Sequence, residues 1–517
     1  MSAFMSLLVC AYGLLIFTFY FVVKGIRPDC PAGANLGSHV QTLISGFRNN
    51  LSHIPGPWYS RFTSLVNHYH RIVGDELQWF HGLHQRYGPL VRPEPYVVAT
   101  ADPGHWEQVH RSRGIFMKIE FPLIVPEKFL FTLTDPHEHR IRRRLLARGL
   151  TLDTLRRNWE PAIRAKVELA VRCIKGEATS GVANVSRWWY IMASDVISLL
   201  SFGESFDMLE KADLKENDEF LTALQFVGFS MALQWLFPGP VLRLLKLVLP
   251  FQTVHDIINA SNLVFARGSI AIRNLRAVNS EKPNLFSDML AEADKAGEGG
   301  EKSKLTDETV RSEVAEFLVA GADTTAVMLT YIVWEVLRQP SLRSRLEAEV
   351  AALPPDFNDT DLLALPLLNG VIAESLRLHS TGSSPASRVV VQDGVTFNSL
   401  PIPAGTQVQT FTYSMARDNA LFPDGERFDE TRFDDEKQMP DLQRRIAANF
   451  GSGSRSCVGV ALARMELRLT TALFFREMRG ARLGPGMTDD MMEMRLRCFI
   501  YPKGGKCDVT LVDKMVQ

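Results

Sequence analysis

Helical spacing of apolar residues dominates the middle of the chain. From about residue 153 to 380 apolar positions recur mostly every three or four residues, which predicts a mainly helical region. The same period indicates a helix over 76–87 and another over 459–478. No repeat and no low-complexity linker interrupts residues 60–517. We therefore expect one large domain over 59–517, mainly α with a smaller β-sheet region.

Strand-like patterns are shorter and lie at three places. PLVRPEPYVVAT (89–100) predicts two strands around a turn, and Pro93 and Pro95 restrict them to a sheet edge because proline donates no ladder hydrogen bond. Residues 387–411 predict a β-rich segment with turn signals at Asp393-Gly394 and Ala404-Gly405. Residues 481–512 mix Gly-Pro-Gly with strand-like runs.

The N-terminus predicts a membrane anchor. Residues 3–23 carry no charge, and 21 residues are enough to span a bilayer as a helix. No Lys or Arg precedes this run, whereas Lys24 and Arg27 follow it, an order that places the body on the cytosolic side. The alternative is a cleaved signal peptide, which typically has a basic start and a shorter apolar run. We expect an uncleaved anchor, followed over 24–58 by a tether that ends in the proline-rich elbow IPGPW.

The apolar runs near 220–250 leave two interpretations open. They are either core helices or a membrane-facing lip at a substrate entrance, since Pro238, Gly239 and Pro240 break the pattern.

Charge and cysteine content exclude several classes of protein. The net charge of -1 over 517 residues gives no electrostatic reason to expect nucleic acid as a partner. The 6 cysteines form no CxxC pair, so neither a disulfide framework nor a zinc finger is indicated.

Cys457 lies in an unusual stretch, FGSGSRSCVG (450–459), with the spacing F-x-x-G-x-R-x-C-x-G. Five fixed letters match by chance on the order of once per ten million positions. Glycines allow the backbone to approach a flat ligand closely, and helical periodicity begins just after Cys457, where free N–H groups favour a thiolate. A structural thiol would not need this pattern, a nucleophile would need a nearby base, and a dinucleotide loop would need a third glycine.

This stretch resembles the haem-binding signature of the cytochrome P-450 family. The resemblance implies the fold of that family, haem b as cofactor, and Cys457 as the axial iron ligand. It also places Phe450 and Arg455 at the cofactor, with Arg455 as a cation for a haem carboxylate.

A long helix over 306–338 carries AGADTT at its centre (320–325). Gly321 destabilises a helix by about 1 kcal/mol relative to Ala, and close approach of a ligand is one reason for it, with a bent core helix as the alternative. The Thr324 hydroxyl is expected to bond back to the carbonyl of Ala320 and bend the helix. Together with the cysteine stretch, the segment resembles the oxygen-activation motif of the family, which assigns Asp323 and Thr324 to proton delivery.

ESLR (374–377) places Glu374 and Arg377 on one helical face. The ExxR pattern alone is weak, because Glu308–Arg311 and Glu335–Arg338 share it and such pairs are usually solvated. The resemblance implies a structural triad in which Arg432 is the third partner. The usual Pro-Glu before that arginine is here Glu430-Thr431.

DPHEHRIRRRLL (135–146) is strongly basic, which is usually a solvated helical face. His139 and Arg143 are four residues apart and match the family helix that binds the haem carboxylates. Arg388 resembles a further partner of these carboxylates. HEH could instead suggest a metal pair, yet HExxH is absent and no third ligand is placed.

The resemblance implies a membrane-anchored haem-thiolate monooxygenase at the endoplasmic reticulum, of fungal secondary-metabolism type, that inserts one oxygen atom from O2 into an apolar small molecule. Terpenoids, polyketides and alkaloids all remain open as substrates. Electrons would come from NADPH through a partner flavoprotein reductase, because no flavin or nicotinamide site is legible. Two alternatives are a haem-thiolate isomerase or dehydratase that needs no external electrons, and a non-catalytic membrane protein that binds haem or lipid.

Overall fold

The computed structural model describes residues 50–511 with several internal gaps. The gaps are 112–113, 120–127, 212–218, 225, 228–229, 231–241, 245–246, 248–251, 279–283, 298–304, 384, 392, 435–437 and 497–498. The predicted anchor at 3–23 and most of the predicted tether lie outside the described residues. Chain contacts form two compact units, the first made of Met1–Met117 and Pro385–Ser414 and the second of Lys118–Ser384 and Met415–Gln517. A discontinuous smaller unit therefore accompanies the large one within the span expected to be a single domain.

The first unit is built on a sheet with the strand order β1-β2-β8-β5-β3. Its strands are β1 (Leu90–Glu94), β2 (Val97–Thr100), β3 (Phe116–Lys118), β5 (Ala386–Val390) and β8 (Gln407–Thr410). β2 is antiparallel to β1 and parallel to β8, which is antiparallel to β5. The predicted edge position is confirmed for β1, which contains Pro93, but was wrong for β2, which lies between two strands.

Short helices and a hairpin complete this unit. They are η1 (Trp58–Arg61), α3 (Leu65–Val73), α4 (Glu76–Tyr87), α5 (Pro103–Arg111), the hairpin of β6 (Val395–Phe397) and β7 (Leu400–Ile402), and α18 (Thr412–Met415), which ends at the boundary of the unit. The predicted helix over 76–87 and the β-rich segment over 387–411 are confirmed.

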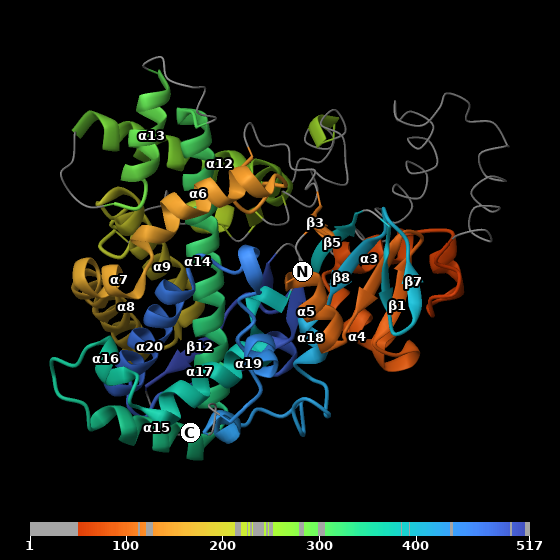
Figure 1. Ribbon diagram of the computed structural model, residues 1–517. Coiled ribbons are helices and arrows are strands. Elements are labelled where there is room, and N and C mark those ends of the chain that lie inside the picture. The colour runs from red at the N-terminus through yellow and green to blue at the C-terminus, as the bar shows by residue number, and fades with distance from the viewer. Residues whose placement is uncertain are drawn as a thin grey trace. The chain divides into compact units, whose positions relative to one another are not determined.

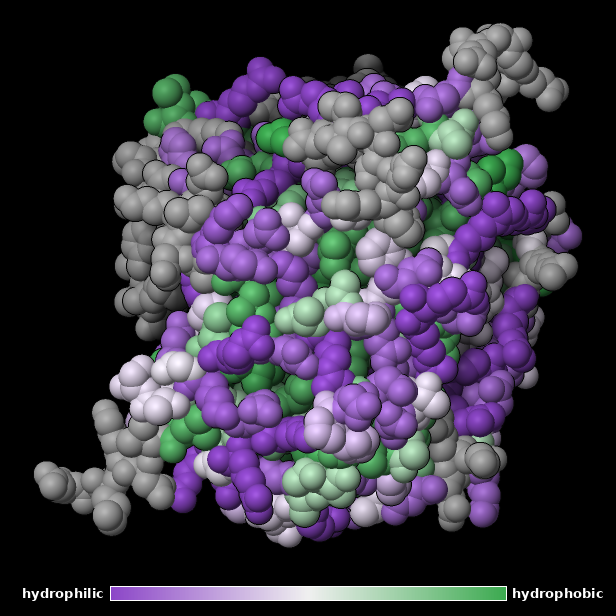
Figure 2. All heavy atoms as spheres, turned by 90° about the vertical axis from the view of Figure 1, so that its left-hand side faces the viewer, coloured by the Kyte–Doolittle hydropathy of each residue, from purple (hydrophilic) through white to green (hydrophobic). Residues whose placement is uncertain are grey.

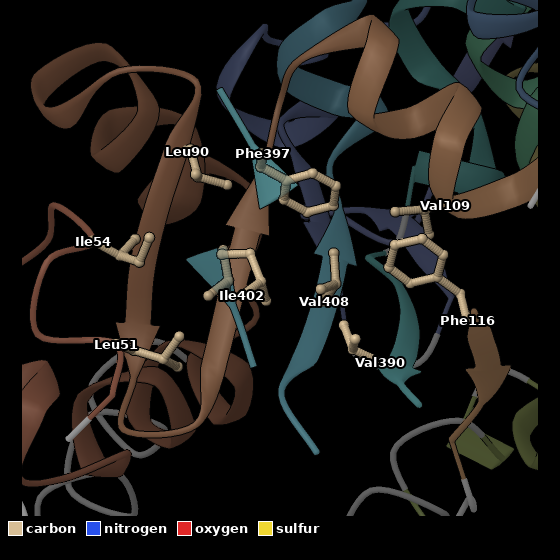
Figure 3. Close-up of a cluster of buried hydrophobic side chains, with 10 residues drawn as sticks. Leu51, Ile54, Leu90, Val109, Phe116, Val390, Phe397, Ile402 and Val408 are labelled. Atoms are coloured by element: carbon tan, nitrogen blue, oxygen red, sulfur yellow. The ribbon is translucent and has the colours of Figure 1, made fainter. Parts of the chain in front are cut away.

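A cluster of buried side chains forms the core beneath this sheet (Figure 3). Leu51 and Ile54 belong to it, so chain that we assigned to the tether is already part of the folded unit. Contacts with Arg92 of β1 also hold the proline-rich elbow in place. The backbone N–H of Arg92 donates to the carbonyl of Pro55 at 2.7 Å, and a Cβ at Gly56 would come within 2.4 Å of the Arg92 carbonyl oxygen. Only glycine fits there, which explains Gly56 between the two prolines.

The second unit is mainly helical and is organised around α14 (Asp307–Leu337), a 31-residue helix shown in green in Figure 1. Its other helices are α6 (Pro136–Gly149), α7 (Leu152–Asn158), α8 (Glu160–Ser180), α9 (Val185–Phe202), α12 (Gln252–Val278), α13 (Ser287–Gly297), α15 (Pro340–Ala351), α16 (Asp359–Leu362), α17 (Pro366–His379), α19 (Asp441–Ala448) and α20 (Val460–Glu477). Helices α9, α12, α17 and α20 pack against α14. The helical predictions for 153–380 and 459–478 are thereby confirmed for the described residues.

Local sequence explains where α14 begins. The Thr306 hydroxyl accepts from the backbone N–H of Thr309, whose side chain in turn accepts from the backbone N–H of Thr306. Asp307 and Glu308 then lie in the first turn, where carboxylates complement the helix dipole. Within the described residues, α14 alone has the length and mean hydropathy of a membrane span, but 83% of that window is buried within the protein. It is therefore a core helix.

Small strands and 3-10 turns fill the remainder of the second unit. β4 (Ala183–Asn184), β12 (Asp508–Thr510) and β9 (Arg482–Leu483) pair in that order, and β10 (Met494–Leu496) pairs with β11 (Ile500–Pro502). The turns are η2 (Thr381–Ser383), η3 (Glu430–Phe433), η4 (Gly453–Arg455) and η5 (Asp490–Met492). The strand-like C-terminus is thus confirmed. Hydrophilic residues predominate on the face shown in Figure 2.

The apolar run near 220–250 is described only in part. Phe220, Leu224 and Val227 are buried, which agrees with the core interpretation for that end of the run. Leu244 and Leu247 are instead 58% and 83% exposed, and the prolines between these two groups lie outside the described residues.

Candidate active site

The loop before α20 presents the Cys457 thiol through its backbone shape. Gly451 and Gly453 adopt φ values of +71° and +68°, a conformation that L side chains rarely adopt. The backbone N–H of Cys457 donates to the carbonyl of Phe450 at 2.8 Å, which closes the loop. Phe450 is half-buried, and the guanidinium carbon of Arg464 lies 5.6 Å from the centre of its ring.

The thiol is accessible although protein surrounds it. Desolvation raises the pKa of Cys457, while the backbone N–H of Gly459 at the start of α20 and the charge of Arg143 act to lower it. The helix terminus and the cation thus favour a thiolate, as the sequence suggested, but burial is the larger cause. An accessible sulfur in this position becomes a thiolate when a metal ion takes the place of its proton.

Two arginines lie beside the cysteine loop. Arg143 of α6 donates from Nη1 to the carbonyl of Ser456 at 2.6 Å and from Nη2 to its hydroxyl at 3.2 Å. Arg455 donates from Nη1 to the carbonyl of Leu133 at 2.6 Å. Burial lowers the pKa of both guanidinium groups, and the charge of Arg143 lowers that of Arg455 further. Two neighbouring, partly desolvated cations form a site that fits an anionic ligand.

The other two predicted carboxylate partners are placed differently. His139 is buried on the same helix as Arg143, one turn earlier. Arg388 lies on β5 of the first unit, where its Nη1 donates to the carbonyl of Ser387 at 2.8 Å. The roles of both residues toward a cofactor stay predictions.

The middle of α14 is accessible on one side only. The Thr324 hydroxyl donates to the carbonyl of Ala320 at 2.6 Å, so the predicted back-bond is confirmed. Ala320 is exposed and Thr324 is half-buried, although most residues around them on the helix are buried. Protein makes the close approach at Gly321, because a Cβ there would lie 2.7 Å from Cγ1 of Ile197 on α9.

Asp323 points into the protein, where sequence reasoning missed its partner. The hydroxyl of Tyr190 on α9 donates to Oδ1 of Asp323 at 2.5 Å, and both side chains are buried. Burial raises the pKa of Asp323 to about 7, against the lowering effect of the Tyr190 hydrogen bond. A carboxyl group of this kind exchanges protons at neutral pH, which suits acid–base chemistry.

A second buried acid bonds to Thr325, two residues after the first along α14. The hydroxyl of Thr325 donates to Oε2 of Glu466 on α20 at 3.0 Å, and burial raises the pKa of Glu466 to about 8. In sequence, Glu466 looks like one more polar residue of an ordinary helix. Only the packing of α20 on α14 shows that it is a buried and largely protonated acid.

The predicted structural triad is assembled. Glu374 and Arg377 are fully buried, and their side chains are joined at 2.6 and 2.7 Å. Nε of Arg432 donates to Oε1 of Glu374 at 3.3 Å, and the backbone N–H of Asp429 donates to the same oxygen at 2.9 Å. Arg377 also donates to the carbonyls of Ala416, Gly425 and Arg427. By contrast, Glu335 and Arg338 are 3.7 Å apart with the arginine 40% exposed.

Comparison with known proteins agrees with this geometry. A family model described as Cytochrome P450 matches residues 55–493. The chain belongs to the cytochrome P450 family. The cytochrome P450 monooxygenase stcB of Emericella nidulans is 36% identical over 480 residues, covering 91% of this chain and 90% of that protein. The cytochrome P450 monooxygenase aflV of Aspergillus parasiticus is 34% identical over 485 residues, covering 91% and 93%.

A further relative has a more specific name. The methylphloroacetophenone oxidase of Cladonia uncialis is 31% identical over 404 residues, covering 75% of this chain and 87% of that protein. The chain is thus a cytochrome P450 enzyme, an oxidoreductase of the monooxygenase class, and the expected resemblance to fungal members is confirmed.

Membership of the cytochrome P450 family implies a haem held by a cysteine thiolate, and the residues present fit that group. The loop offers an accessible sulfur, positive-φ glycines and two neighbouring guanidinium groups for an anionic edge. Cys173 and Cys507 are also free cysteines, but Cys507 is buried with a thiol pKa well above its usual range. The chemistry of the donor set therefore favours the Cys457 loop.

Proposed function

We propose that this cytochrome P450 is a haem-thiolate monooxygenase that inserts one oxygen atom from O2 into an apolar small molecule. When bound, the haem supplies the chemistry that divides dioxygen between the product and water. The observation that carries the proposal is the Cys457 loop: an accessible thiol in a glycine-shaped turn beside Arg143 and Arg455. Cys457 would ligate the iron through its thiolate.

The chain's own residues have separate tasks in this proposal. Arg143 and Arg455 would bind the haem carboxylates, with His139 and Arg388 as further partners, and Phe450 would pack at the cofactor. Asp323 would take up and release protons, since its pKa of about 7 lets both forms exist at neutral pH. Thr324 would hold and pass on a proton at its hydroxyl, on the accessible side of α14.

The setting of the enzyme is part of the same proposal. Electrons would come from NADPH through a flavoprotein reductase. The uncharged run at 3–23 would anchor the chain in the endoplasmic reticulum membrane with its body in the cytosol. We propose a role in secondary-metabolite biosynthesis, and methylphloroacetophenone is the first compound to screen because a relative is named for its oxidation.

The reduced carbon monoxide difference spectrum of the purified protein tests the ligand assignment. A strongly red-shifted Soret band is expected from thiolate-ligated haem. Haem without that shift would show that Cys457 does not ligate the iron. Well-folded protein that binds no haem would contradict the whole proposal.

Thr324→Ala tests whether the protein is an enzyme and whether its reaction depends on proton transfer through the Thr324 hydroxyl. We expect the variant to retain haem and the red-shifted band but to lose most substrate oxidation in the presence of reductase. Thr330→Val is the matched control, because Thr330 makes the same back-bond, to Ala326 at 2.8 Å, in a buried part of the same helix. Substrate conversion without reductase would instead point to an isomerase or dehydratase.

A further inference from the structure

A buried phenol lies against the acid that we assign to proton delivery. The Tyr190 hydroxyl donates to Oδ1 of Asp323, whereas Oδ2 is a buried oxygen without a hydrogen-bond partner among the described residues. Buried polar atoms normally have partners, and exceptions are frequent where a group takes part in chemistry. One carboxyl oxygen is thus fixed by the protein, and the other is free to gain or lose a proton.

Close packing of two helices creates this arrangement. Tyr190 and Ile197 are seven residues apart on α9, about two turns, so they share a face. Ile197 lies against Gly321, where a Cβ would come within 2.7 Å of it, and the glycine therefore lets α9 approach α14 closely. The same approach buries Asp323 and brings the phenol of Tyr190 within hydrogen-bond distance.

The two groups respond to this contact in opposite ways. Burial and the neighbouring Asp323 charge raise the pKa of Tyr190 well above its usual range, so the phenol keeps its proton and stays a donor. A donor stabilises the charged form of a carboxyl group, and the Tyr190 hydrogen bond accordingly lowers the pKa of Asp323 against the effect of burial. Without the phenol, burial alone would keep the acid protonated to higher pH.

We propose that Tyr190 is a positioning residue for proton delivery: its phenol holds the Asp323 carboxyl and keeps it able both to take up and to release a proton. The idea rests on the proposed function, which gives Asp323 its role. The proton that moves is the one at Oδ2 of Asp323. Each proton delivered is first taken up there and then released, and water formation needs two such deliveries per turnover, so Asp323 ends unchanged and Tyr190 keeps its own proton.

Other titratable groups border this part of α14 and must be separated from Tyr190 in a test. Glu466 from α20 accepts a hydrogen bond from Thr325. Further along α14 are Glu335 and Tyr331. His379 from α17 bonds to Glu335 and stacks on Tyr331. Tyr190 is the group whose hydrogen bond bears on the pKa of Asp323.

Infrared difference spectroscopy of the haem-loaded enzyme measures the proton on the carboxyl group directly. The C=O band of the protonated Asp323 carboxyl group is identified by its loss in Asp323→Asn. Its intensity is then followed as a function of pH in the wild-type protein and in Tyr190→Phe. The wild-type midpoint is expected near pH 7. In Tyr190→Phe we expect it to move upward by about one pH unit or more, because a hydrogen bond to a charged group is lost. With reductase present, the alkaline limb of NADPH consumption should move in the same direction.

Two further measurements keep the proposal falsifiable. Tyr331→Phe removes a buried phenol that acts on the pKa of Tyr190 but makes no hydrogen bond to Asp323, and it should leave the midpoint in place. Replacing the tyrosines with 3-fluorotyrosine makes every phenol a stronger donor, so the midpoint should move downward even if Tyr190→Phe does not fold. An unchanged midpoint in a folded Tyr190→Phe protein would overturn the role of Tyr190. The carbon monoxide spectrum of the wild-type protein is independent of this result, so failure of the proposed function would be recognised separately.

Discussion

The Cys457 loop and the middle of α14 are both parts of the candidate active site, but the groups around them differ in charge. Around Cys457, Arg143 and Arg455 supply positive charge and the backbone N–H of Gly459 faces the sulfur. Around Asp323 and Glu466 the polar neighbours are neutral hydroxyl groups, and burial raises the pKa of each acid to about 7 and about 8. In the first region cations and a backbone N–H thus counter the effect of burial on the thiol, whereas the second holds acids that keep a proton at neutral pH.

This contrast separates ligation from proton handling. A metal ligand must be deprotonated, and a cationic setting helps to keep it so. A group that donates protons must hold one near the working pH, and a dry site lined by hydroxyl groups achieves this for a carboxyl group. The two regions can therefore be disturbed independently, which makes the comparison testable.

Removing the sulfur tests the first region with the largest expected effect. Cys457→Ala should abolish thiolate-ligated haem completely, since no other group in the loop can replace a thiolate. The reduced carbon monoxide spectrum reports the loss. Cys173→Ser is the control, because Cys173 is a free and half-buried cysteine on α8 that should leave the spectrum unchanged. An unchanged spectrum in Cys457→Ala would end the ligand assignment.

Removing one member of the buried triad tests how much the buried ion pair of Glu374 and Arg377 contributes to the stability of the fold. Arg377→Ala should destabilise the protein by about 3–5 kcal/mol, because the buried Glu374 would lose its two shortest hydrogen bonds and Arg377 would no longer tie three backbone carbonyls together. Urea unfolding measures the change. Arg338→Ala removes the exposed partner of a similar i,i+3 pair and should cost roughly 0–1 kcal/mol. Equal effects of the two substitutions would mean that burial of the ExxR pair does not matter.

The pH dependence of stability tests the second region. A carboxyl group whose folded-state pKa is raised stabilises the fold below its unfolded pKa, and this contribution is lost as the pH rises through the folded-state pKa. For Glu466 that window runs from 4.5 to about 8. Glu466→Gln should remove this dependence, so that relative to wild type it gains on the order of 3 kcal/mol between pH 5 and pH 8. Urea unfolding of both proteins at pH 5 and at pH 8 measures this difference in stability. If Glu466 were already ionised at pH 5, the stability of the variant relative to wild type would be the same at both pH values.

Removing one cation from the first region should have the smallest effect. Arg143→Ala is expected to weaken haem retention roughly 10- to 100-fold, the range for one charge-assisted hydrogen bond, while Arg455 remains. Transfer of haem to apomyoglobin measures retention. Arg144→Ala, an exposed neighbour on α6, is the matched control. Retention equal to wild type in Arg143→Ala would show that the cations serve the loop and not the cofactor.

The parts of the molecule that depend on local rules could be predicted from the amino-acid sequence. Helical spacing of apolar residues predicted α4 and α20, and the long helix α14 was also expected, because such signals act within a few residues of one another. The motif around Cys457 was specific enough to give the family, and the back-bond from Thr324 to Ala320 is a local contact within one helix. The interior position of β2 was missed, since strand order depends on segments hundreds of residues apart.

Tertiary structure alone decided which groups are buried together. Only the packing of α9 on α14 explains Gly321, which meets Ile197, and pairs Asp323 with Tyr190, a residue 133 positions away. Of the three ExxR patterns, packing buried Glu374 and Arg377 and left Arg338 exposed. The physical reason is that desolvation depends on atoms brought in from every side, and a sequence does not state which distant segments will supply them.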